Sequence, residues 1–476
     1  MEIIEAKYPL LSLVLFLPLI GTIVGMFFLK ADEKFVKTIT ILFSAATFVL
    51  SIGIVCGFTA GSAAYQWVER KTWIEGLGVQ YYLGVDGLSL FLVILTTFMG
   101  LIAVIYATTM KERSKGFMLY MLLAETGMLG VFMAMDFILF FLFWEVMLVP
   151  LYLIIGIWGG EGRLYATLKV FLYTLFGSIF MFVGIIAIYM IHGNATGEYT
   201  FDILKLYDTV IPQRQQFWIF LALFMGFAIK APLIPLHTWL PHAYKATPIA
   251  ANVILAGVMT KMGIYGFIRF NLPILPDASY YFVPVILALA VVGMVYGALI
   301  ALAQKDIKNI VAYASLSHLG YIAAGVFAMN AEGIDGSVIQ MINHGIYIGA
   351  LFLIVGMLFE RRQSWLLKDY GNAVKTMPIF ATIFFIVVIG AAGIPGGNGF
   401  IGEFLIMVGL FAQKHWLAGA VMALGITVGV AYKMGMYQKL MIFKGKEVRE
   451  WDSRDVSLTE AACLVPLALL VLYLGL

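Results

Sequence analysis

Residues 228–267, AIKAPLIPLHTWLPHAYKATPIAANVILAGVMTKMGIYGF, decide the class of fold. The stretch is largely apolar, and a bilayer core about 30 Å thick needs roughly 20 apolar residues per helix, so we predict parts of two membrane-spanning helices. Lys261 lies too far from either end of its apolar run for the side chain to reach the membrane surface. The first helix should break just after Lys230, because proline removes amide donors and clashes with the preceding turn, and three prolines follow: Pro232, Pro235 and Pro241.

The whole chain has the composition of a membrane protein. Of its 476 residues 62% are hydrophobic and 12% are charged, which excludes a soluble enzyme. The net charge of +3 argues against nucleic acid as a partner. Cys56 and Cys463 are far apart in the sequence and cannot by themselves form a zinc or iron–sulfur framework. We therefore expect no metal and no cofactor in this chain.

Long apolar runs predict an all-α polytopic protein with about fourteen transmembrane helices, since lipid tolerates no unpaired backbone groups. The runs lie near 8–29, 37–60, 85–108, 117–135, 136–158, 165–192, 214–230 with a continuation to about 244, 248–271, 282–304, 307–329, 335–359, 376–412, 415–440 and 457–476. Residues 1–476 should thus form a single membrane domain. Most Lys and Arg residues of the connections follow odd-numbered helices, which predicts both termini on the non-cytoplasmic side.

A short motif that occurs twice in the sequence suggests repeats within this domain. KMGIY at 261–265 recurs as KMGMY at 433–437, and GAAGIPGGNGFIGEFL at 390–405 predicts a second helix break, at Pro395. Helices 7 and 12 should therefore be discontinuous. Helix 7 then corresponds to helix 12 and helix 8 to helix 13, and because five is an odd number, the corresponding helices cross the membrane in opposite directions. We predict two inverted five-helix repeats, helices 4–8 and 9–13. The corresponding segments are 1–116 for helices 1–3, 117–271 and 282–440 for the repeats, and 457–476 for the C-terminal helix.

Four lysines lie within apolar runs: Lys169, Lys230, Lys261 and Lys433. A charge at the bilayer centre costs at least about 2.5–3.5 kcal/mol, so it usually faces a partner or a wet cavity. Lys169 and Lys433 are close enough to the ends of their runs to extend to the headgroups, and both readings stay open for them. For Lys261, and for Lys230 beside the break, we favour a functional role.

Carboxylates and histidines complete a candidate proton relay. Glu145 has no cation near it in sequence, so its counterion must come from another helix, and Glu403 follows the second break. Lys–Glu pairs that form and separate can take up and release protons near neutral pH. His318 and His344 lie on successive helices and suit the same chemistry, although hydrogen-bonded core residues or, formally, haem ligands remain alternatives. Secondary candidates are Glu125, Lys433, His237 and His242, while Asp86 and Asp136 could equally be helix caps.

The ordered motifs resemble the antiporter-like subunits of respiratory complex I, which are related to subunits of multisubunit cation/proton antiporters. The segments that carry the resemblance are FWEVMLVPLYLIIGIWGG around Glu145, residues 228–267, DIKNIVAYASLSHLGY with His318, MINHGIYIGALFLIVG with His344, and GIPGGNGFIGEFL with Glu403. Glutamate at position 403 is the mark of the M-type subunit, because its sister subunits usually carry lysine there.

The resemblance implies the role of each residue. Glu145 would pair with Lys230, Lys261 would be the central relay, and His318 and His344 would connect it to Glu403. It also implies neighbouring antiporter-like and other complex I subunits as partners, with NADH, FMN, iron–sulfur clusters and quinone bound in those chains. The expected location is the bacterial cytoplasmic membrane. The alternative functions are a Na+/H+ antiporter or membrane-hydrogenase subunit, and a structural scaffold, which would leave the buried lysines unexplained.

Overall fold

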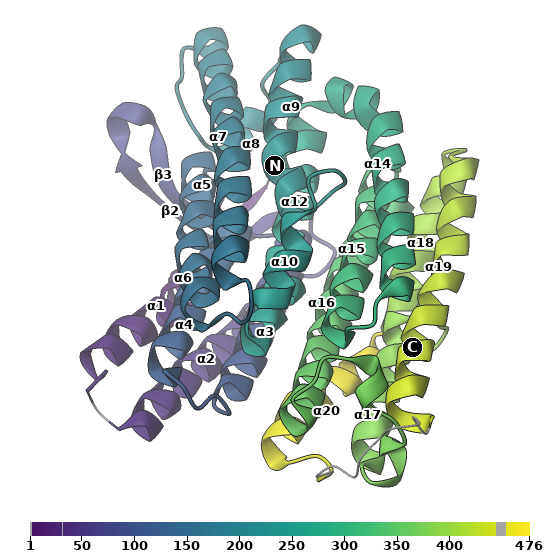
Figure 1. Ribbon diagram of the computed structural model, residues 1–476. Coiled ribbons are helices and arrows are strands. Elements are labelled where there is room, and N and C mark those ends of the chain that lie inside the picture. Colours follow the sequence, from purple (N-terminus) through teal and green to yellow (C-terminus); the bar gives the residue numbers. More distant parts are fainter. Residues whose placement is uncertain (1, 31, 444–453) are drawn as a thin grey trace. The chain divides into compact units, whose positions relative to one another are not determined.

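Apolar helices make up most of the computed structural model, which describes residues 2–30, 32–443 and 454–476 (Figure 1). Within this part, ten helical segments are long and apolar enough to cross a membrane: Leu10–Phe27, Glu33–Cys56, Gly87–Ala107, Ser114–Met133, Phe137–Trp158, Arg163–Thr196, Ile249–Ile274, Pro276–Ala303, Ala331–Arg362 and Trp416–Ile442. Shorter apolar helices occupy Pro378–Ala391, Asn398–Ala412 and Leu458–Tyr473. The prediction of an all-α polytopic membrane protein is confirmed, whereas the count of fourteen and the inverted repeats stay predictions.

The helices fall into two compact units. Unit 1 comprises Met1–Gly159, Thr167–Lys230 and Val258–Tyr281, and unit 2 comprises Gly160–Ala166, Ala231–Gly257 and Phe282–Leu476. In unit 1, α1 packs against α2 and α4, and α3 packs against α2 and α4. The helices of unit 1 are α1 (Leu10–Phe27), α2 (Glu33–Cys56), α3 (Gly87–Ala107), α4 (Ser114–Met133), α5 (Phe137–Val146), α6 (Leu148–Trp158), most of α7 (Arg163–Thr196), α8 (Ile203–Tyr207), α9 (Gln213–Lys230), α12 (Lys261–Gly266) and α13 (Leu272–Ile274).

Unit 1 also contains a small sheet that sequence analysis did not predict. Its strand order is β1 (Ile3–Glu5), β2 (Tyr65–Ile74), β3 (Val79–Val85), with β1 parallel and β3 antiparallel to β2. The β2–β3 hairpin turns at Gly78, which has a φ of 67° that favours glycine. The signal lay in the connection 61–84, where two runs rich in aromatic and β-branched residues flank a glycine-containing turn.

Unit 2 is organised around α16 (Ala331–Arg362), a long and largely buried helix. Its main neighbours are α15 and α18, and α11, α17 and α20 also pack against it. The long helices of the unit run side by side (Figure 1). The remaining helices are α10 (Trp239–Ala246), α11 (Ile249–Ile254), most of α14 (Pro276–Ala303), α15 (Ile307–Val326), α17 (Pro378–Ala391), α18 (Asn398–Ala412), α19 (Trp416–Tyr437) and α20 (Leu458–Tyr473).

Both expected helix breaks are confirmed. The helix α9 ends at Lys230, and regular helix resumes only at Trp239, the start of α10. The helix α17 ends at Ala391 and α18 begins at Asn398, with Gly393 and Gly396 between them at φ values of 65° and 93°. Left-handed backbone of this kind favours glycine, which explains the glycine-rich sequence of the second break.

Four further interruptions, one break and three π-helical turns, were not predicted from the sequence, and they lie near candidate residues. The helix that contains Glu145 is interrupted at Met147, where α5 gives way to α6; Pro150 cannot donate to the carbonyl of the residue four positions earlier. Lys261 lies between two π-helical turns, Leu255–Met259 and Phe267–Asn271, and a third, Gln438–Ile442, follows α19. Single π-helical turns inside helices are frequent at functional sites.

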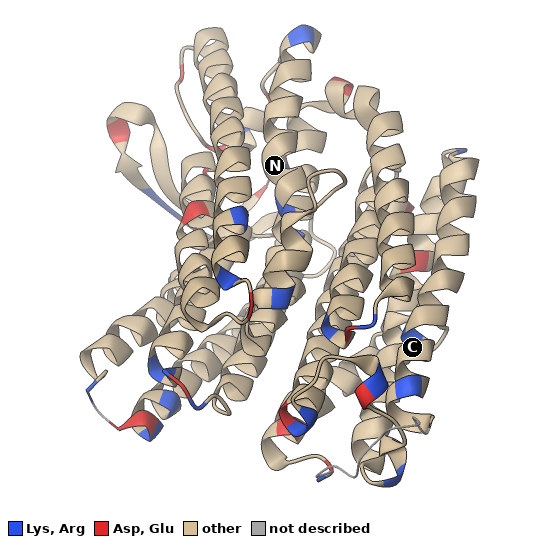
Figure 2. Cartoon of the chain, in the orientation of Figure 1, with Lys and Arg blue, Asp and Glu red and all other residues tan. Residues whose placement is uncertain are grey.

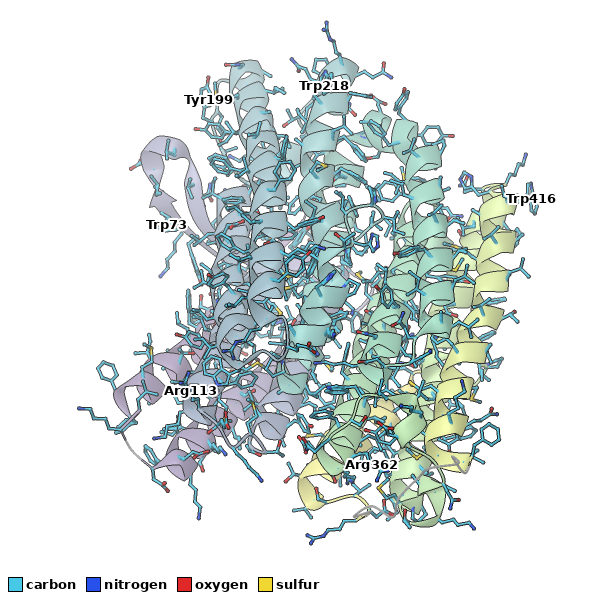
Figure 3. All side chains as sticks on the ribbon, in the orientation of Figure 1. Trp73, Arg113, Tyr199, Trp218, Arg362 and Trp416 are labelled. Atoms are coloured by element: carbon cyan, nitrogen blue, oxygen red, sulfur yellow. The ribbon has the colours of Figure 1, made fainter. Side chains whose placement is uncertain are left out.

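The ends of the helices differ from their middles in the placement of charged and aromatic residues. Most of the helical length carries no charged residue (Figure 2). In unit 1, the exposed Tyr199 and Trp218 lie at the end opposite Arg113, and in unit 2 the exposed Trp416 lies at the end opposite Arg362 (Figure 3). Aromatic and basic residues at helix ends are typical of the two faces of a membrane.

Candidate functional site

The first pair of candidate residues lies inside unit 1, where α5 and α9 end. Lys230 is the last residue of α9 and is 1% exposed, and its Nζ lies 5.0 Å from the centroid of the Trp144 ring. Trp144 is held in place by a hydrogen bond of 3.2 Å from its Nε1 to Ser178 Oγ. Lys230 thus ends in an aromatic, water-poor environment, where an ammonium ion is attracted to the face of the ring.

Glu145 is the charged group that acts on Lys230. Among the described residues, however, neither Lys230 Nζ nor Glu145 Oε1 has a hydrogen-bond partner, and no ion pair joins them. The two groups therefore interact electrostatically across a gap. A charge that lacks direct partners in a buried place is sensitive to small movements of its neighbours.

Lys261 lies in the next segment of unit 1. It begins α12, its exposed fraction is 0%, and its Nζ donates a long hydrogen bond of 3.5 Å to Thr260 Oγ1. The helix α12 packs against both α9 and α4, so Lys261 and Lys230 belong to adjoining helices. The helix α4 carries Glu125, 1% exposed, whose carboxylate has no hydrogen-bond partner in the described part of the chain. Gly100 of α3 makes room for this carboxylate, since a Cβ there would lie 2.8 Å from Glu125 Cδ.

In unit 2, three titratable side chains from three helices form a connected row. His318 of α15 has its Nδ1 3.0 Å from Glu403 Oε1 of α18 and its Nε2 2.7 Å from Lys433 Nζ of α19. All three side chains are buried. Lys433 Nζ also donates to the carbonyl of Ala391, the last residue before the second helix break. Both ring nitrogens of His318 thus face charged side chains.

The row is extended by polar neighbours from α16. The rings of His318 and His344 lie 5.7 Å apart, and the Tyr347 ring contacts both, at centroid distances of 5.3 and 5.5 Å. Gln340 Nε2 donates to Tyr347 Oη at 3.2 Å and to Glu403 Oε1 at 3.3 Å. His344 thus lies beside the row, and His318 contacts Glu403 directly.

Lys433 was one of two ambiguous intramembrane candidates, because sequence analysis allowed it to extend to the headgroups. Its exposed fraction is 3%, and its ammonium group points to His318 and the Ala391 carbonyl. The sequence did indicate an internal position for Lys433, since the repeated motif KMGIY/KMGMY makes Lys433 the counterpart of Lys261. Lys169, the other ambiguous lysine, is half-buried with its Nζ 5.8 Å from the Tyr173 ring centroid.

The histidines near the first break have local contacts. His237 is buried, with its ring 5.2 Å from that of Tyr296. His242 is exposed, its Nδ1 lies 2.8 Å from the Thr238 carbonyl, and its ring is 5.3 Å from that of Tyr165. Asp86 and Asp136 cap α3 and α5, as the capping interpretation expected.

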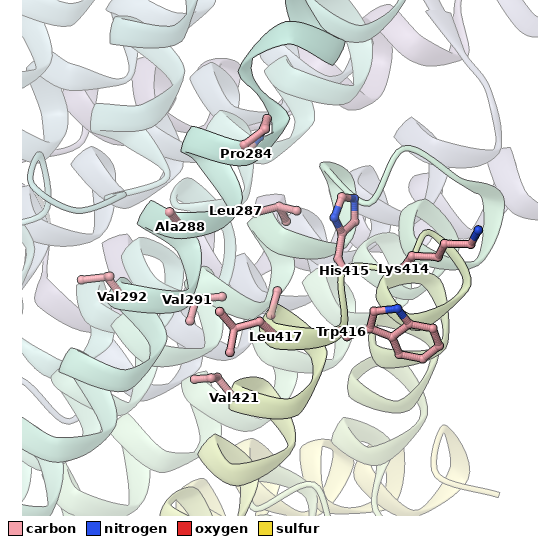
Figure 4. A pocket seen from close by; sticks show the side chains of 11 residues that line it. Pro284, Leu287, Ala288, Val291, Val292, Lys414, His415, Trp416, Leu417 and Val421 are labelled. Atoms are coloured by element: carbon pink, nitrogen blue, oxygen red, sulfur yellow. The ribbon is translucent and has the colours of Figure 1, made fainter.

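Outside the candidate relay, the structure has a mainly apolar pocket but no cluster of metal ligands among its described residues. Among the described residues, no group of three or more His, Cys, Asp and Glu side chains is placed to hold a metal ion. A pocket of about 670 Å³ lies along α14 and the start of α19 (Figure 4). Its wall is mainly apolar, with residues such as Leu287, Val291 and Leu417, and it contains none of the candidate relay residues.

Comparison with known proteins places this geometry in a family. Residues 134–429 match the family described as NADH:quinone oxidoreductase/Mrp antiporter, TM. NADH-quinone oxidoreductase subunit M of Rickettsia typhi is 40% identical, over 99% of this chain and 96% of that protein.

Two solved structures share the fold. A chain of respiratory complex I from Thermus thermophilus with bound NADH superposes with a TM-score of 0.88 at 30% identity, covering 98% of this chain and 95% of its own. A chain of the Mrp complex from Dietzia sp. gives a TM-score of 0.84 at 21% identity, covering 98% and 95%, and is similar in fold alone. The chain therefore belongs to the antiporter-like membrane subunits of the NADH:quinone oxidoreductase/Mrp family.

Proposed function

We propose that the chain is a proton-translocating subunit of an NADH-quinone oxidoreductase, of the M type, driven by electron transfer in partner subunits. One observation carries the proposal: each unit buries a lysine beside a helix break and sets a carboxylate to act on it. The pairs are Lys230 with Glu145 in unit 1 and Lys433 with Glu403 in unit 2. Intramembrane charges at broken helices are typical of ion sites in transporters.

In unit 1 the proposed step is electrostatic. Two unit charges about 4 Å apart attract by about 4 kcal/mol at an effective dielectric of about 20, and by less at greater distance. Moving one charge across 100 mV requires about 2.3 kcal/mol, which is of similar size. A movement of Glu145 toward or away from Lys230 would therefore change how firmly Lys230 holds its proton. Lys261, on the adjoining helix, would be the next proton carrier.

In unit 2 the geometry suits transfer through His318. Lys433 is a donor only, so it donates to a lone pair on Nε2, and the neutral imidazole then carries its own proton on Nδ1, facing Glu403. When Lys433 gives a proton to Nε2 and Nδ1 gives its proton to Glu403, Lys433 and Glu403 both become neutral. His318 ends as the other neutral tautomer, and one proton has crossed the row.

The proposed assembly follows the family. NADH, FMN, iron–sulfur clusters and quinone would be bound by partner subunits, and neighbouring antiporter-like subunits would contact this chain in the membrane. The aromatic and basic helix ends support a location in a membrane, which would be the bacterial cytoplasmic membrane. Both termini would then face the non-cytoplasmic side.

The test is proton pumping by the assembled complex in membrane vesicles, measured per NADH oxidised. Lys230→Ala and Glu145→Gln should each strongly reduce pumping, because the electrostatic pair is lost. Lys169→Ala is the matched control, since it removes a half-buried lysine of the same unit and should leave pumping unchanged. Normal pumping in fully assembled Lys230 and Glu145 variants would overturn the proposal.

An Na+/H+ antiporter or membrane-hydrogenase subunit is the second candidate, favoured by the shared fold of the Mrp chain. Glu403 distinguishes the two, because it is the mark of the M-type subunit. Vesicles that acidify or alkalinise in response to an imposed sodium gradient, without NADH, would support the second candidate. A response to NADH alone would support the first.

A further inference from the structure

The buried Arg269 and the half-buried Asp86 form an ion pair at the end of unit 1 that carries the β-sheet. The Asp86 carboxylate accepts two hydrogen bonds from the guanidinium, from Nη1 to Oδ2 at 2.8 Å and from Nη2 to Oδ1 at 2.7 Å. The Arg269 side chain is 9% exposed and that of Asp86 is 22% exposed. Two parallel hydrogen bonds between an arginine and a carboxylate are strong and fix the orientation of both groups.

Residues of α3, β2 and α8 also contact the pair. Asp86 also caps α3 by accepting from the Ser89 amide at 3.0 Å. Tyr65, the first residue of β2, accepts a hydrogen bond from Arg269 Nη1, and Tyr207 of α8 donates to the Arg269 carbonyl at 2.9 Å. The guanidinium therefore has a fixed position between the sheet, α3 and α8.

Arg269 also lies in line with Lys261. Lys261, Tyr265 and Arg269 are spaced four residues apart, so they follow one side of the same helical segment over about 12 Å. Arg269 Nε donates to Tyr265 Oη at 3.1 Å, and Tyr265 Oη in turn donates to the Phe132 carbonyl at 3.3 Å. The Tyr265 side chain is thus a polar group that lies between Lys261 and Arg269 along this segment.

The direction of these hydrogen bonds opposes proton transfer. A proton that left Lys261 through Tyr265 would have to be accepted next by the guanidinium. Arginine has five N–H donors and no acceptor, and it is not deprotonated in proteins. A fixed arginine is also the kind of barrier by which membrane channels exclude protons. Because Asp86 neutralises the positive charge of Arg269, the guanidinium adds little electrostatic repulsion to the ammonium group of a protonated Lys261.

We propose that the Arg269–Asp86 pair is a proton seal, which prevents a proton on Lys261 from leaving unit 1 through the sheet end. This inference rests on the proposed proton translocation through Lys261, and it assigns Arg269 a positioning role outside the relay. Loss of the guanidinium would do more than remove a barrier. Asp86 would become an unpaired carboxylate, able to accept a proton at the end of the Lys261–Tyr265 row.

The experiment measures passive proton leak with no NADH present, which separates it from pumping. Vesicles containing the assembled complex, loaded with a pH-sensitive dye, receive a potassium diffusion potential. Arg269→Gln should raise the rate of proton entry several-fold above wild type. The double variant Lys261→Ala/Arg269→Gln should return it to the wild-type rate, because the row then lacks its proton donor. A purely structural clamp predicts a leak that persists in the double variant, and that result would overturn the seal.

Two further variants keep the test decisive. Arg70→Gln is the matched control: Arg70 pairs with Asp202 at 2.8 Å in the same unit, away from the Lys261 row, and its loss should leave the leak at the wild-type rate. Arg269→Lys retains the charge and a partner for Asp86, which favours assembly, but an ammonium group can exchange its proton. It should leak at a rate between wild type and Arg269→Gln. A wild-type rate in either assembled Arg269 variant would overturn the proposal, while the Lys230→Ala pumping assay would still test the proposed function.

Discussion

His318 Nδ1 lies 3.0 Å from Glu403 Oε1, which joins α15 to α18 in the interior of unit 2. The other ring nitrogen faces Lys433 at 2.7 Å. A lysine and a glutamate are thus linked by a single imidazole, the side chain whose unperturbed pKa is nearest to physiological pH. In this proposed step, the Lys433 ammonium group and the Glu403 carboxylate both lie within 3.0 Å of the imidazole that would carry the proton.

We expect His318→Gln to lower the rate of proton pumping by at least about tenfold, since removal of a positioned acid–base group typically costs 10²–10⁴ in proton-transfer rate. Glutamine has similar size and polarity but cannot carry a proton. Pumping per NADH oxidised in vesicles is the measurement. His242→Gln is the control, because His242 is exposed and lies against Thr238 and Tyr165. Equal pumping by the two variants would exclude His318 from the path.

Lys433→Met should also reduce pumping strongly, because methionine fills similar space without a proton to donate to His318. The Glu403 carboxylate would then lose the cation that acts on it. Lys169→Met provides a direct comparison, since sequence analysis treated both lysines alike and only Lys433 is buried among titratable partners. Comparable effects of the two substitutions would show that burial in the membrane, and not the contact with His318, determines the phenotype.

The sequence predicted the helical architecture and the two helix breaks because those features depend on local composition. Apolar length determines which segments can span a membrane, and prolines or glycines determine where helix cannot continue. The candidate residues were found for the same reason, since a charge inside an apolar run is visible without a structure.

What the sequence did not provide is the spatial arrangement of the side chains. Nothing in the local sequence around His318 indicates that its two nitrogens face Lys433 and Glu403, which come from helices far along the chain. Arg269 was not singled out from the sequence, because its partner Asp86 lies more than 180 positions away. Pairings of this kind depend on helix packing, which sequence periodicity does not specify.

Because of the Asp86–Arg269 pair, the free energy of unfolding should depend on pH in acidic solution. Burial alone would raise the pKa of Asp86, but the Arg269 guanidinium and the Ser89 hydrogen bonds lower it from 3.8 to about 2. Because this carboxyl group is more acidic in the folded protein, its contribution is fully present above about pH 4 and is lost as the pH falls toward 2. The shift corresponds to about 2 kcal/mol.

The check on this prediction is thermal unfolding of the complex in lipid nanodiscs. Asp86→Asn should lower the midpoint relative to wild type at pH 7, and the difference should shrink at pH 3. Asp202→Asn serves as a control for the loss of an aspartate that pairs with arginine in the same unit. A difference between Asp86→Asn and wild type that is equal at both pH values would contradict the predicted loss of the carboxylate's contribution in acid.

Gly393 at the second helix break should be intolerant of any side chain. It has a φ of 65°, and a Cβ there would collide with Glu403 Oε2. Gly396 is the matched control, because its φ of 93° carries a similar backbone penalty while a Cβ would meet nothing within 4 Å. Each alanine substitution should cost about 1–3 kcal/mol of stability through the strained backbone. Gly393→Ala should in addition displace Glu403 from His318 and lower pumping, whereas Gly396→Ala should pump normally. Thermal unfolding and pumping measured on the same preparations separate the two effects, and equal pumping by both variants would show that the break does not position Glu403.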